Sequence, residues 1–227
     1  MNQRILVWDL PTRIFHWSLA LSFTGAFLTC ESERLCNIHL LCGYTVLGLI
    51  FFRLVWGFVG TRYARFSEFV RSPACVIRYL LQLFKGRAKH PVGHNPAGAI
   101  VILLLLLLGI ASSVSGWAVY EVIGGDWLEE LHDYASYSML AVVFVHIAGV
   151  LVTNYLQGEN LIGAMITGRK RGNANQAISG NKAVIAMLLI TVLIGCLIWV
   201  WPESKDEWWF RETGQGLIEF LFNRHTL

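Results

Sequence analysis

Stretches of about twenty apolar residues recur along this chain, and each is long enough to cross a lipid bilayer. The clearest example runs from Ala97 to Val119 and contains six consecutive leucines without a charged residue. That combination excludes an ordinary core helix of a soluble domain. Only 15% of all residues are charged, whereas a soluble domain carries about a quarter. The sequence therefore predicts an integral membrane protein, with membrane lipid as its solvent.

The apolar runs predict five membrane spans. They cover Ile14–Cys30, Leu35–Val59, Ala97–Val119, Leu131–Leu156 and Ala183–Trp201. The first run lacks a small-residue cleavage site, so we interpret it as a retained helix and not as a signal peptide. No Gly/Ser-rich linker interrupts the chain. We expect an all-α integral membrane fold, with a four-helix bundle in residues 5–172, a fifth transmembrane helix in 173–202 and a tail in 203–227.

Charged residues are divided unevenly between the connections. Gly60–Pro96 contains seven basic residues and one acid, and Gln157–Lys182 contains four basic residues and one acid. The other two loops, Glu31–Asn37 and Tyr120–Glu130, are rich in acids and share one basic residue, Arg34. The positive-inside rule places the basic connections and the N-terminus in the cytoplasm, and the C-terminal tail on the other side. These basic runs are short and tied between membrane helices, which argues against a nucleic-acid partner.

Four of the seven histidines belong to predicted spans, where an ionisable side chain is costly and usually functional. These are His16, His39, His132 and His146. His132 and His146 are fourteen residues apart, which in an α-helix is about 21 Å and close to four full turns, so both rings face one side. Because successive spans run in opposite directions, His39 lies at the level of His132, and His16 at that of His146. The spacing predicts two pairs at two depths.

A pair of neutral imidazoles at one level suits a six-coordinate haem iron, which has no open position for oxygen or substrate. Such a centre transfers electrons. Gly43 lies one turn after His39, and Gly149 follows His146 in the same way; glycines there let a macrocycle lie close to the backbone. The alternative is that each histidine only hydrogen-bonds a neighbouring helix. The matched depths favour haem.

Arg53 and His94 are further candidates at the cytoplasmic level. Arg53 lies fourteen residues after His39 and so faces the same way, at the depth of the other pair. A buried guanidinium needs an anion, and the interior of no other span offers one, so a haem propionate is the candidate. An arginine that snorkels to the surface is the alternative. His94 is either a loop residue before the helix cap Asn95 or a neighbour of a quinone head group.

Several motifs occur together in an order that resembles a known family. They are Val7–Trp17, His39 with Gly43, Arg53–Gly60, Gly93–Pro96 and the pair His132 and His146. Over about residues 5–172 they are similar to the bacterial cytochrome b561 family, and in particular to its branch of b-type cytochrome subunits of nickel–iron hydrogenases. The resemblance implies two non-covalent haem b groups with His16, His39, His132 and His146 as ligands. It also implies electron transfer between the quinone pool and a periplasmic redox partner at the bacterial inner membrane.

The chain differs from the hydrogenase subunits in its very short first periplasmic loop and in its fifth span with a tail. These differences favour a small c-type cytochrome as the partner, and the acid-rich external loops suit a partner that is basic around its haem edge. A membrane-anchor subunit of a nickel–iron hydrogenase, or of a similar periplasmic oxidoreductase, is the alternative. A non-redox anchor or an ion transporter with structural histidines is a further alternative, but neither explains the two depths.

The five cysteines include no Cys-x-x-Cys-His motif, so we expect no covalently attached c-type haem. Cys30 and Cys36 flank the short loop on the oxidising side of the membrane. They form either a disulfide, which persists in that compartment, or two separate thiols.

Overall fold

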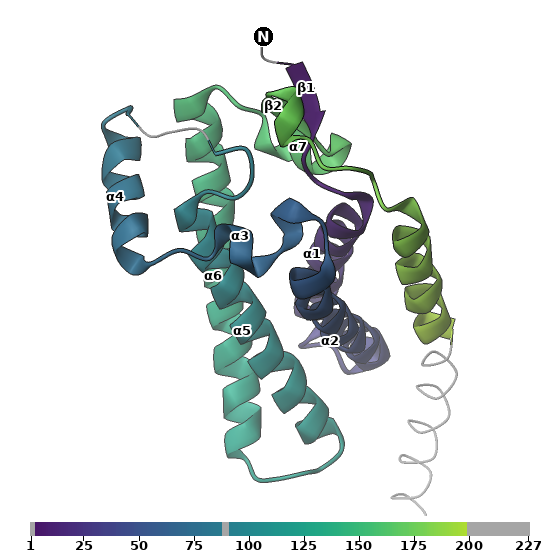
Figure 1. Cartoon of the computed structure of the whole chain (residues 1–227). Helices are drawn as coiled ribbons and strands as arrows, with labels where there is room; N and C mark the ends of the chain where they lie inside the picture. The colour runs from purple at the N-terminus through teal and green to yellow at the C-terminus, as the bar shows by residue number, and fades with distance from the viewer. Residues whose placement is uncertain (1–2, 88–90, 199–227) are drawn as a thin grey trace, which may run out of the picture.

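The computed structural model describes residues 3–87 and 91–198, and the predicted tail at 203–227 lies outside them. Four long helices correspond to the first four predicted spans (Figure 1). They are α1 (Leu10–Thr29), α2 (Cys36–Val59), α5 (Pro96–Tyr120) and α6 (Trp127–Gln157). A further helix covers Ala183–Ile198. The prediction of an all-α integral membrane bundle is confirmed.

Within the described residues, three helical segments are long and apolar enough to cross a membrane on length and composition. They are Glu33–Val59, Pro96–Tyr120 and Trp127–Gln157. Helix α1 is not among them, because it begins with polar residues around Arg13 and His16. It nevertheless packs along α2, while α5 packs along α6 and α2 joins the two helix pairs through α5. The bundle thus consists of two helical hairpins in contact.

The helix starts follow from their caps. Helix α1 begins at Leu10, four residues before the predicted start, because the Asp9 carboxylate accepts a hydrogen bond of 2.8 Å from the backbone N–H of Thr12. Asn95 caps α5 in the same way, with 2.7 Å between its side-chain oxygen and the N–H of Gly98. Both caps satisfy an N–H that the helix leaves without a partner. The predicted cap at Asn95 is confirmed.

The core of the bundle contains residues from four helices. They are Phe15, Val46, Leu49, Ile50, Leu106 and Leu189. Leu189 belongs to the helix Ala183–Ile198, whose Ala186 is also fully buried. That helix therefore packs against the bundle. Large apolar side chains cover the outside of the helices, as expected for surfaces in contact with lipid.

The basic connections fold into short elements at one end of the bundle. They are the 3-10 turn η2 (Arg62–Ala64) and the helices α3 (Phe66–Phe69), α4 (Pro73–Phe84) and α7 (Leu161–Thr167). Two more 3-10 turns are η1 (Glu33–Leu35), before α2, and η3 (Ala174–Gln176), after the second strand. Figure 1 shows α7 and the N-terminus at the end of the bundle opposite the α5–α6 connection.

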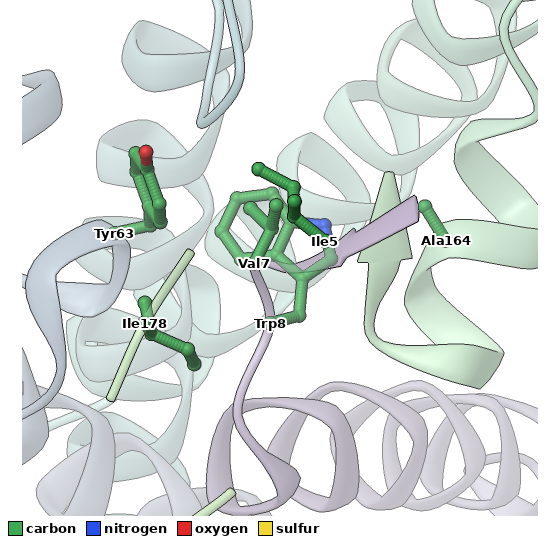
Figure 2. Packing of buried hydrophobic residues seen from close by; sticks show 6 residues of the cluster. All are labelled: Ile5, Val7, Trp8, Tyr63, Ala164 and Ile178. Atoms are coloured by element: carbon green, nitrogen blue, oxygen red, sulfur yellow. The ribbon is translucent and has the colours of Figure 1, made fainter. Parts of the chain in front are cut away.

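A two-stranded antiparallel sheet closes this end. Strand β1 (Gln3–Leu6) pairs with β2 (Arg169–Gly172), so the N-terminus is joined to the segment after α6. Beneath it lies a second apolar cluster, shown in Figure 2. Its buried members are Ile5, Val7, Trp8, Tyr63, Ala164 and Ile178. The three N-terminal residues of the cluster therefore hold the start of α1 against both basic connections.

Candidate functional site

The structure brings His39 of α2 beside His132 of α6, with 6.1 Å between their ring centroids. The Nδ1–H of His39 donates a hydrogen bond of 2.9 Å to the carbonyl oxygen of Ala26 in α1. The Nδ1–H of His132 donates one of 2.8 Å to the carbonyl oxygen of Ser112 in α5. Because a carbonyl only accepts, both rings carry their proton on Nδ1 and keep the Nε2 lone pair free. A free Nε2 is a metal ligand.

A notch in α5 receives the His132 ring. A Cβ at Gly116 would lie 2.7 Å from two atoms of that ring, so no larger residue fits without moving it. One turn earlier, the hydroxyl groups of Ser112 and Ser136 are 2.7 Å apart and link α5 to α6. The sequence reasoning did not identify Gly116 or Ser112, since nothing local to α5 indicates which helix faces it.

The second pair is His16 of α1 and His146 of α6, with 6.4 Å between the ring centroids. The ring of Trp17 meets that of His16 edge to face at 5.1 Å. Among the described residues, the buried Nδ1 of His16 has no hydrogen-bond partner. A buried polar atom without a partner is rare in a folded protein and points to a missing group.

The spacing of both pairs fits one metal ion between two rings. An imidazole nitrogen lies about 2 Å from a metal that it binds, so two rings on opposite sides of one ion have centroids roughly 6 Å apart. Room for a larger group is present as well. A Cβ at Gly43 or Gly149 would meet no atom within 4 Å, so the backbone is open beside His39 and His146. The paired imidazoles at each level therefore fit the two nitrogen ligands of a haem iron.

Arg53 is buried, with 3% of its surface exposed, so it does not snorkel. Its guanidinium lies over the rings of Phe66 and Phe69, at 4.9 and 5.8 Å from the centroids. Its Nη1 has no hydrogen-bond partner among the described residues. A buried cation with a free donor is a site for an anion.

An acid that lies outside the predicted spans comes near this arginine. Asp9, just before α1, is fully buried and attracts Arg53 electrostatically. However, its two carboxylate oxygens accept hydrogen bonds from Thr12, Trp56 and Thr61, and no ion pair joins it to Arg53 among the described contacts. Sequence reasoning missed Asp9 because it lies outside every predicted span.

His94 lies in the loop just before the cap Asn95, and its side chain is partly buried. Its ring lies 4.5 Å from that of Trp8 and 4.6 Å from that of Phe69, between centroids, and its buried Nδ1 has no partner among the described residues. Burial, followed by the positive charges of Arg53 and Lys170, lowers the pKa of His94 to about 3. The ring is therefore neutral at physiological pH. Phe69 also contacts the Arg53 guanidinium, so His94 and Arg53 contact the same aromatic ring.

Cys30 and Cys36 are both free thiols in the structure and both are exposed. The thiol of Cys30 donates a hydrogen bond of 3.0 Å to the carbonyl oxygen of Phe27. Cys30 and Cys36 are therefore two separate thiols in the structure and do not form a disulfide.

Comparisons with known proteins agree on one family. The family model described as prokaryotic cytochrome b561 matches residues 7–168. A probable Ni/Fe-hydrogenase B-type cytochrome subunit of Azotobacter vinelandii is 27% identical over 210 residues, covering 72% of this chain and 87% of the relative. One from Rhizobium leguminosarum bv. viciae is 25% identical over 215 residues, covering 74% and 90%. No solved structure matches the chain significantly.

Proposed function

From the premise that this chain belongs to the prokaryotic cytochrome b561 family, we propose that it carries electrons across the membrane through two haem b groups. The chain is a membrane b-type cytochrome. One haem lies between His16 and His146, and the other between His39 and His132. The observation that carries the proposal is the pair of ring separations, 6.4 and 6.1 Å, because each suits a single iron with two imidazole ligands.

A haem, when bound, would supply an iron that accepts and gives up one electron. The protein supplies the rest. The carbonyl oxygens of Ala26 and Ser112 fix the rings of His39 and His132 and make their Nε2 atoms more basic. Arg53 donates to a propionate of the other haem through its free Nη1.

The two sites together span most of the bilayer. Fourteen residues of α6 separate its two histidines, which is about 21 Å along a helix, whereas the hydrocarbon core is about 30 Å thick. Electrons entering at one level therefore leave near the opposite surface. We propose the inner membrane, with the basic connections and the N-terminus in the cytoplasm, as the positive-inside rule requires.

A redox enzyme of the hydrogenase kind is the partner that the comparisons favour. The relatives named above are described as probable Ni/Fe-hydrogenase B-type cytochrome subunits, and the chain covers 87% of one and 90% of the other. These relatives support a hydrogenase-like partner, the alternative, over the small c-type cytochrome that the sequence favoured. A small c-type cytochrome remains the second candidate, since acids at Glu31, Glu33, Glu129 and Glu130 are exposed beside the His39/His132 pair.

Quinone exchanges electrons, in this proposal, at the His16/His146 haem. His94 supports this placement, because its ring contacts Phe69, and Phe69 also contacts Arg53, the residue proposed to hold a propionate of that haem. A neutral imidazole with an unused Nδ1 forms a hydrogen bond with a carbonyl or hydroxyl oxygen of the quinone ring.

Counting haems and then removing ligands tests the two-haem proposal. A pyridine haemochrome assay should give two haem b groups per chain. Redox titration of His39→Ala should retain one component, and His16→Ala should retain the other. A fully loaded protein with a single haem, or two variants that lose the same component, would refute the assignment. A colourless protein would favour the non-redox alternatives.

Electron donors distinguish the two partners. The purified cytochrome is mixed with a nickel–iron hydrogenase under hydrogen, or with a reduced c-type cytochrome, and reduction of its haems is followed in the visible spectrum. Rapid reduction by the hydrogenase alone supports the enzyme partner. Rapid reduction by the c-type cytochrome alone supports the second candidate.

A further inference from the structure

The small sheet presents three arginines on one face. In the register of β1 and β2, Arg4 lies opposite Arg171 and Leu6 lies opposite Arg169, while Lys170 lies opposite the buried Ile5. Arg4, Arg169 and Arg171 therefore share the exposed face. Like charges directly opposite each other destabilise a strand pair. A bound anion would reduce this repulsion.

No acid of the described chain neutralises these arginines. The nearby Glu159 forms an ion pair of 3.0 Å with Lys170, whose side chain is buried and also donates to the carbonyl oxygen of Pro91. Within residues 3–87 and 91–198, none of the three arginines forms an ion pair. Three positive charges on these two four-residue strands thus have no ion-pair partner among the described residues.

The arginines surround a pocket. It has a volume of about 270 Å³ and lies between the ribbon and the α6–α7 connection, with Arg4, Arg169 and Arg171 in its lining. Asn160 and Thr167 add polar surface to its wall, which also contains Glu159 and its ion-pair partner Lys170. A guanidinium matches the oxygens of a phosphate in geometry as well as in charge. The pocket therefore suits a phosphate group.

The same end of the molecule lies at the rim of the bilayer. The indole Nε1 of Trp17 in α1 donates a hydrogen bond of 3.3 Å to the carbonyl oxygen of Met165, which holds α7 beside the start of the first span. Ile162 and Ile166, one turn apart on α7, are 44% and 58% exposed. Exposed apolar side chains beside a membrane span face lipid, so the pocket lies at the depth of the lipid head groups.

We propose that the pocket between the β1–β2 ribbon and the α6–α7 connection binds the phosphate of an anionic phospholipid head group. The lipid phosphate neutralises the Arg4–Arg171 pair and fixes the N-terminal strand to the membrane surface. Basic residues near a bilayer attract anionic lipids. The proposal rests on the ribbon and on the membrane position, and does not depend on the haem assignment.

Native mass spectrometry of the haem-loaded protein in detergent tests this proposal. The added probes are phosphatidylglycerol, the zwitterionic phosphatidylcholine and, separately, inorganic phosphate. The test variant is R4Q/R169Q/R171Q, and the matched control R65Q/R78Q/R87Q removes three exposed arginines from the other basic connection. The wild type and the control should retain one phosphatidylglycerol per chain. The test variant should bind it about tenfold to a hundredfold more weakly.

Other outcomes would overturn the proposal. Equal loss in both triple variants would mean that the attraction is a general property of the basic end. Equal binding of phosphatidylcholine would remove the charge argument, and displacement of the lipid by millimolar inorganic phosphate would make the ligand a free anion. Far-ultraviolet circular dichroism reports whether the variants are folded, independently of haem. If the triple variant is not, R4Q alone should show a partial loss, and unchanged binding would reject the site.

Discussion

The indole Nε1 of Trp56 donates a hydrogen bond of 3.2 Å to Asp9, across 47 residues of sequence. The bond joins the last turn of α2 to the first turn of α1. The Thr61 hydroxyl donates to the same carboxylate oxygen, and the N–H of Thr12 to the other oxygen. Since Asp9 is fully buried, its carboxylate is the shared acceptor that fixes the relative position of the two helices.

Replacing Asp9 should therefore destabilise the bundle. Asp9→Ala removes a helix cap, which costs about 1 kcal/mol, and leaves two buried donors unpaired, at about 1–3 kcal/mol each. We expect a loss of roughly 3–7 kcal/mol in the free energy of unfolding, measured by denaturation in detergent. The control Glu129→Ala changes an exposed acid. Equal stability of the two variants would contradict this role.

Gly116→Ala should disturb the His39/His132 site alone. The new methyl group would lie 2.7 Å from the His132 ring, and overpacking of this kind costs about 1–3 kcal/mol. We expect loss or a shifted potential of that haem component in a redox titration, with the other component unchanged. Gly195→Ala is the matched control, because its methyl group would meet no atom within 4 Å. A normal titration of Gly116→Ala would show that the notch is not needed.

Arg53 should set the potential of the His16/His146 haem. A positive charge held in a low-dielectric interior stabilises the reduced iron, so removing it lowers the midpoint potential. Arg53→Met should lower the potential of that component by several tens of millivolts, whereas Arg53→Lys should restore part of the value. If both substitutions act equally, the charge is not the cause, and the packing of the guanidinium on Phe66 and Phe69 explains the effect.

The sequence predicted those features that depend on periodicity along one helix. Fourteen residues between His132 and His146 place both rings on one face of α6, and the alternation of spans assigns each a neighbour from another helix. The structure brings those neighbours, His39 and His16, within 6.1 and 6.4 Å. Their role as haem ligands stays a prediction.

Features that depend on contacts between distant segments were not predictable. Strand β1 pairs with a segment that follows α6, and two four-residue strands carry too little alternation to be recognised. The partner of the His132 Nδ1 is a backbone carbonyl of Ser112, which every residue type offers equally. Asp9 was not singled out from the sequence, because its bonds to Trp56 and Thr61 depend on how α1 and α2 meet.

The burial of His94 predicts a specific dependence of stability on pH. Its pKa is about 3 in the folded protein, against an ordinary value of 6.5, so the unfolded chain binds a proton more readily. The contribution of the neutral ring to stability is therefore fully present above pH 6.5 and is lost progressively as the pH falls toward 3. The groups that act on the ring are Arg53, Lys170, His146 and His16. The positive charges of Arg53 and Lys170 oppose its protonation.

His94→Gln should remove this part of the acid sensitivity, because glutamine does not titrate. Between pH 6 and pH 4 the free energy of unfolding of the wild type should fall more steeply than that of the variant, by up to about 1.4 kcal/mol per pH unit. Denaturation in detergent at a series of pH values measures both slopes, and carboxylates that titrate in the same window cancel in the comparison. Parallel slopes would mean that the His94 ring already accepts a proton in the folded protein, and that its Nδ1 faces a partner able to stabilise the charge.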